Sequence, residues 1–175
     1  MWLFYVFMVI TIITVYALAC YPKVARSVPI NYILLFLFTI AEAYMISIIA
    51  SYYDSTTVLM AGGLTAAATV GLTIYAFYTK KDFTKLGGFL FALILVLIVG
   101  GIFAIFIRNK WLNLGLAILG VLVFSIYLVF DTQLIIGKNE RKFSIDDYIM
   151  AAMNLYLDII NLFLYILQIL GTVNN

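Results

Sequence analysis

The chain has 175 residues, of which 66% are hydrophobic and only 10% are charged. An ordinary soluble domain carries roughly a quarter charged residues, so this composition excludes a water-soluble globule. The net charge of +2 comes without a dense basic tract, which argues against a nucleic-acid partner. A single cysteine, Cys20, and no histidine exclude an intramolecular disulfide and leave a zinc or haem site without ligands.

Six apolar segments follow one another along the chain, each long enough to cross the hydrocarbon core of a bilayer as a helix. They cover residues 2–20, 29–52, 57–78, 87–107, 112–136 and 148–171. Strands of a membrane barrel would be about ten residues long with alternating polarity, whereas these segments are about twice that length and apolar on all sides. The sequence therefore predicts an all-α polytopic membrane bundle, forming a single transmembrane domain over residues 1–175.

Basic residues gather in alternate connectors. The first, third and fifth connectors hold Lys23, Arg26, Lys80, Lys81, Lys85, Lys138, Arg141 and Lys142, and the second and fourth hold only Arg108 and Lys110. Because Lys and Arg in short loops stay cytoplasmic, the odd-numbered connectors are expected on the cytoplasmic side. Residue 1 would then lie on the opposite side, and one further helix before it would explain that orientation.

Three acidic residues, Glu42, Asp131 and Asp158, fall inside apolar segments. A charged carboxylate at the bilayer centre costs about 3 kcal/mol on insertion scales, so such groups normally face the bundle interior and mark function. If Asp131 and Asp158 face one another, they would share a proton, and without it they would offer oxygen ligands to Ca²⁺. This predicts a proton-sensing cation site; the alternatives are a static hydrogen-bonded pair or two unrelated acids that serve packing.

The last apolar segment also carries a stripe of polar side chains. Its members are spaced by four, three, four and three residues, which places them on one face of a helix. They are Asn154, Asp158, Asn161, Tyr165 and Gln168. We expect this face to lie against protein or water, because lipid cannot satisfy its hydrogen bonds.

In its last two apolar segments, which contain Asp131 and Asp158, the sequence resembles the transmembrane Bax inhibitor motif family. The resemblance is carried by VFDTQLIIG (129–137) and DDYIMAAMNLYLDIINLFLYILQILG (146–171). Upstream, PINYILLFLFTIAEA (29–43) and TIYAFYTKKDFTKLGGFLFAL (73–93) look like its Lifeguard branch, which includes Golgi anti-apoptotic proteins. The resemblance implies a bundle of seven helices with a central last helix, the first family helix being absent here. It also implies calcium leak from internal stores and restraint of cell death in Golgi or reticulum membranes, with the mitochondrial inner membrane as the alternative.

The resemblance assigns roles to individual residues. Asp131 and Asp158 match the paired pH-sensing aspartates of the family, and Asp146 resembles an acid near the start of the last helix that is tied to ion conduction. Glu42 is kept as an accessory acid. A basic residue that latches the closed state by bonding the aspartate pair corresponds to Arg26, with Lys23 as the second choice. As the alternative, Arg26 is a plain cytoplasmic anchor.

Three alternative functions are compatible with the residues described above. The first is a pH-sensitive calcium or cation leak channel surrounded by membrane lipid, with Ca²⁺ as the permeant or bound ion and no other cofactor. The second is a non-conducting scaffold that binds membrane-protein partners through its helices. The third, an intramembrane aspartyl protease, is disfavoured because neither Asp131 nor Asp158 stands in a Gly-X-Gly-Asp motif. The sequence therefore predicts that the chain is not an enzyme.

Overall fold

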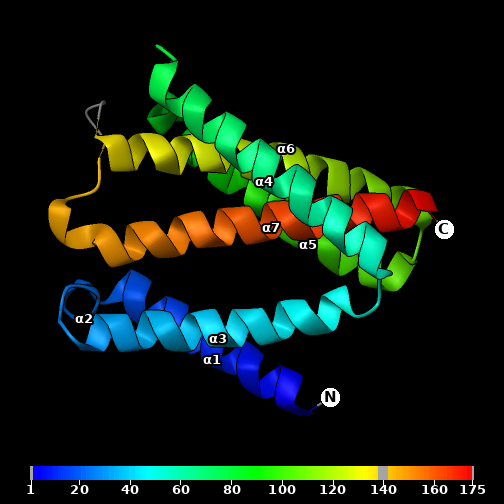
Figure 1. Ribbon diagram of the computed structural model, residues 1–175, viewed down its shortest axis with the longest axis horizontal. Coiled ribbons are helices and arrows are strands. Elements are labelled where there is room, and N and C mark those ends of the chain that lie inside the picture. Colours follow the sequence, from blue (N-terminus) through cyan, green and yellow to red (C-terminus); the bar gives the residue numbers. More distant parts are fainter. Residues whose placement is uncertain (1, 138–141, 175) are drawn as a thin grey trace. The chain divides into compact units, whose positions relative to one another are not determined.

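The computed structural model describes residues 2–137 and 142–174, and within these ranges every regular element is a helix (Figure 1). Six of the described helices are long and apolar enough to cross a membrane. They are α1 (Trp2–Cys20), α3 (Ile30–Ala50), α4 (Ser55–Tyr78), α5 (Gly87–Ile107), α6 (Lys110–Ile136) and α7 (Tyr148–Asn174). The predicted all-α polytopic fold is confirmed, and no predicted end of a span differs from the observed end by more than three residues.

Three short helices occupy connectors in which no element was predicted. They are α2 (Pro22–Ala25) and the 3₁₀ helices η1 (Phe83–Leu86) and η2 (Ile145–Asp147). Each lies in one of the connectors rich in basic residues. Two of those basic residues, Lys138 and Arg141, fall outside the described part of the chain.

The turn between α5 and α6 shows why these helices end where they do. Arg108 takes a left-handed conformation (φ 47°, ψ 37°), and its N–H donates to the carbonyl of Ala104 at 3.1 Å. The Asn109 side chain then caps α6 by accepting from the backbone N–H of Trp111 at 2.8 Å. This cap satisfies one of the amide groups that the first turn of a helix leaves free.

The described residues form two compact units. The first joins residues 1–54 to residues 143–154, and the second joins residues 55–142 to residues 155–175. Helix α7 therefore contributes its first turns to one unit and its remaining turns to the other. The single transmembrane domain expected from the sequence stays a prediction.

In the first unit, α1 packs alongside α3 (Figure 1). The ring of Phe7 lies against that of Tyr44, with 4.5 Å between their centroids. Asn31 is fully buried and stabilises the connector between the two helices, because its side-chain N–H donates to the carbonyl of Ala25 at 3.1 Å.

In the second unit, α6 contacts α4, α5 and η1. The backbone of α6 also approaches α7 closely at Gly120, where an added Cβ would lie 2.5 Å from the ring of Tyr165. Small residues allow membrane helices to pack at such short range. In the part of α7 that belongs to this unit, no residue from Leu155 to Thr172 is exposed.

Candidate functional site

Asp131 of α6 and Asp158 of α7 meet inside the second unit. Their carboxyl groups lie close enough to interact, and the two residues are only 5% and 4% exposed. A carboxylate can only accept hydrogen bonds, so a bond between two carboxyl groups requires at least one proton on the pair. Asp158 Oδ2 is buried and has no hydrogen-bond partner among the described residues. The structure therefore places two interacting carboxyl groups in a buried position.

The part of α6 around Asp131 is anchored by its neighbour Gln133, which is 1% exposed. Gln133 Oε1 accepts from the backbone N–H of Phe83 at 2.8 Å, and its Nε2 donates to the carbonyl of Lys81 at 2.9 Å. One amide thus ties α6 to the α4–α5 connector two residues from the carboxyl pair. Sequence reasoning assigned no role to Gln133; its only signal was a polar side chain beside Asp131 at the end of an apolar segment.

Aromatic rings line the same stretch of α6. Tyr127 lies one turn before Asp131 on the same helix, and its ring contacts that of Phe130 in an edge arrangement. Phe124 stacks on Tyr165 of α7 with 5.8 Å between the ring centroids. The two carboxyl groups of the pair are buried, which strengthens electrostatic interactions between them.

The remaining polar stripe of α7 divides into three kinds of contact. The side-chain N–H of Asn161 donates to the carbonyl of Leu157 at 2.8 Å, so this amide is hydrogen-bonded within its own helix. Tyr165 and Gln168 line a cavity of about 350 Å³ with residues of α5 and α6, among them Asn113. Asn154 is half-buried and belongs to the first unit.

The accessory acid Glu42 is 9% exposed and lies in the first unit, on α3. Among the residues described, no group of three or more His, Cys, Asp or Glu side chains is placed to hold a metal ion. The expected calcium site therefore rests on the two carboxyl groups of Asp131 and Asp158, and it stays a prediction.

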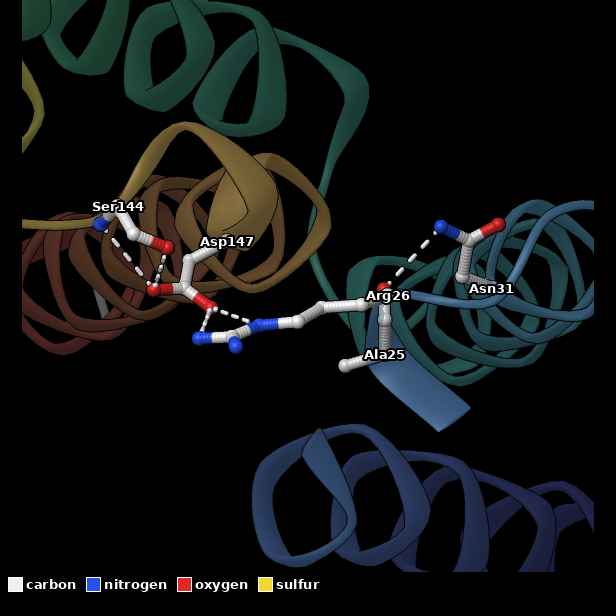
Figure 2. Close-up of polar contacts among 5 residues, drawn as sticks. All are labelled: Ala25, Arg26, Asn31, Ser144 and Asp147. Carbon is white, nitrogen blue, oxygen red and sulfur yellow. Dashed lines mark hydrogen bonds and ion pairs between the residues drawn. The ribbon is translucent and has the colours of Figure 1, made fainter. Parts of the chain in front are cut away.

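Arg26 has a partner that sequence reasoning did not assign. Its Nε and Nη2 both donate to Asp147 Oδ1, at 3.0 Å and 2.8 Å, as Figure 2 shows. The other carboxylate oxygen, Oδ2, accepts from the backbone N–H of Ser144 at 3.1 Å and from its hydroxyl at 2.7 Å. Asp146 and Lys23 are both exposed. The predicted latch between Arg26 and the aspartate pair stays a prediction.

Comparison with known proteins places this arrangement in a family. The whole chain, residues 1–175, matches the family described as "Inhibitor of apoptosis-promoting Bax1". The chain belongs to this Bax inhibitor family. It is 42% identical over 146 residues to the Golgi anti-apoptotic protein of vaccinia virus, in strains Lister, LC16m0 and LC16m8. The match covers 83% of this chain and 60% of each relative, so the chain spans less than two thirds of their length.

For this Bax inhibitor family member, the resemblance expected from the sequence is confirmed, as is its integral membrane character. The carboxyl pair lies in the two C-terminal segments that carried the resemblance, VFDTQLIIG and the last helix. Calcium leak, pH sensing, the partners and the absence of enzymatic activity stay predictions.

Proposed function

We propose that this Bax inhibitor family member is a pH-sensitive calcium or cation leak pathway of an endomembrane that restrains cell death, with Asp131 and Asp158 as its gate. One observation carries the proposal: two buried carboxyl groups from different spanning helices lie close enough to interact. Buried acids within spans normally serve ion or proton pathways. The name of the vaccinia relatives, Golgi anti-apoptotic protein, supports a Golgi membrane and an anti-apoptotic role.

The proposed gate depends on whether the pair of carboxyl groups holds a proton. With a proton on the pair, the two carboxyl groups hold α6 and α7 together. Without it, two negative charges about 4 Å apart repel one another by about 4 kcal/mol at an effective dielectric constant of 20. The four oxygens then attract a hard cation such as Ca²⁺, which prefers carboxylate ligands. Loss of the proton therefore both loosens the contact and creates the binding site.

Polar groups continue from the gate along α7. Tyr165 and Gln168 follow Asp158 on the same helix face and line the cavity between α5, α6 and α7. An ion leaving the carboxyl pair would meet these oxygen-bearing side chains before the end of the span. These polar side chains beside the cavity support a route for ions that starts at the carboxyl pair.

The test is calcium flux from vesicles that contain the purified chain, measured across a range of pH. We expect flux that rises as the pair loses its proton, and a loss of this pH response in Asp131→Asn and Asp158→Asn. Asp82→Asn is the matched control, because it removes one carboxylate of the same unit while Asn keeps the ability to cap a helix. Flux with an unchanged pH profile in both pair variants would rule the gate out. A chain that shows no flux and always copurifies with stoichiometric membrane proteins would instead support the scaffold function.

A further inference from the structure

The segment immediately before α7 exposes a serine beside acidic residues. Ser144 is exposed and extended (φ −74°, ψ 161°), and Ile145, which follows it, is 94% exposed. Asp146 is exposed as well. The distribution of basic residues puts this connector on the cytoplasmic side, where protein kinases and ATP are found. A kinase binds its substrate as an exposed, extended segment. Ser144 already has that form, whereas the 3₁₀ turn η2, which holds Asp146 and Asp147, must unwind for binding.

We propose that Ser144 is a phosphorylation site for an acid-directed serine/threonine kinase, and that the Arg26–Asp147 ion pair limits its phosphorylation. Kinases of this class recognise acidic side chains two and three positions after the serine, and Asp146 and Asp147 occupy those positions. In the transfer, Ser144 Oγ forms a bond to the γ-phosphorus of ATP while the bond to the leaving ADP breaks. The hydroxyl proton passes to the catalytic base of the kinase.

Both oxygens of the Asp147 carboxylate are engaged before any kinase binds. Oδ1 accepts two bonds from Arg26, and Oδ2 accepts the hydroxyl of Ser144, the group that would be modified (Figure 2). A kinase must therefore displace Arg26 from Asp147 and free the hydroxyl. Because the ion pair is partly exposed, we expect this competition to slow phosphorylation roughly two- to fivefold.

A phosphate on Ser144 would rearrange the same contacts. Esterified Oγ carries no hydrogen, so its bond to Asp147 Oδ2 is lost. The phosphate bears nearly two negative charges and repels the adjacent carboxylate, while its oxygens are strong acceptors for a guanidinium group. The backbone beside Arg26 stays fixed, because buried Asn31 holds the carbonyl of Ala25 (Figure 2). Arg26 therefore exchanges Asp147 for the phosphate by moving its side chain alone.

The test is phosphorylation of the purified full chain in detergent by a casein kinase with radiolabelled ATP, and mass spectrometry to locate the phosphate. We expect labelling of Ser144 in the wild type, none at this position in Ser144→Ala, and slower labelling in Asp146→Asn and Asp147→Asn. Arg26→Gln should be labelled roughly two- to fivefold faster, because Asp147 is then free. Lys80→Gln is the control: it removes one exposed positive charge from another connector and should leave the rate unchanged.

Two results would overturn the proposal. The site would be excluded if no phosphate were found at position 144 in the wild type, in Arg26→Gln or in Ser144→Thr, which keeps a hydroxyl. All variants must retain the helical circular dichroism of the wild type for this comparison. Equal labelling rates in Arg26→Gln and the wild type would exclude control by the ion pair. Neither readout involves ion flux, so these outcomes are independent of the proposed leak pathway.

Discussion

Replacing Gly120 by alanine tests the close approach of α6 to α7. The added Cβ would lie 2.5 Å from Tyr165 Cδ2 and 2.6 Å from Cγ and Cε2, so the ring must shift. The ring cannot shift freely, because it stacks on Phe124. Overpacking of this kind costs about 1–3 kcal/mol, against a gain of about 1 kcal/mol from the higher helix propensity of alanine. We therefore predict a net loss of up to about 2 kcal/mol.

Gly115→Ala is the matched control, because it lies in the same helix and an added Cβ there meets nothing within 4 Å. It should gain about 1 kcal/mol from helix propensity. The two variants should thus differ by about 1–3 kcal/mol, which corresponds to melting temperatures separated by about 2–12 °C for a chain of this size. The assay is thermal unfolding in detergent followed by far-ultraviolet circular dichroism. If Gly120→Ala melts at or above Gly115→Ala, the close packing of α7 on α6 is refuted.

Three further changes probe the connectors. Gln133→Leu removes both bonds to the α4–α5 connector and should lower the free energy of unfolding by about 1–3 kcal/mol in a denaturant titration. The hydroxyl of Thr84, which bonds the Asp82 carboxylate, holds the pKa of Asp82 below its usual range. The ionised Asp82 carboxylate therefore stabilises the fold above the unfolded pKa of about 3.9, and this stabilisation is lost as the pH falls through the lower folded pKa. Between about pH 5 and pH 3 the melting temperature should therefore fall further in the wild type than in Asp82→Asn. Arg108→Gly relieves a left-handed conformation that costs an L-residue about 1 kcal/mol, so its melting temperature should rise by about 2–4 °C; a fall would contradict this.

The spans were predictable because their signal is local. A run of apolar residues of the right length must form a helix wherever it enters a bilayer, and its ends follow from nearby charged or turn residues. The helix α2 and the 3₁₀ turns were missed, because single turns carry too few residues for a periodic pattern.

The candidate site was predictable in part. Asp131 and Asp158 stood out as acids in apolar surroundings, and the structure brings them together. Gln133 and Asp147 did not stand out, because their partners Phe83 and Arg26 lie 50 and 121 positions away from them. The spacing within one helix says nothing about which distant segment will approach it.

The shielding of α7 has a consequence for how the protein is made. The span ending in α7 has a mean hydropathy of 1.7, against 3.2 for the span containing α5, and it carries Asp158 and several amides. Such polar groups make the span partition into lipid less readily than the α5 span when it leaves the translocon. Because it is translated after the other five described spans, those helices are already in the bilayer and can receive its polar face. Integration of the α7 span therefore depends on the spans that precede it.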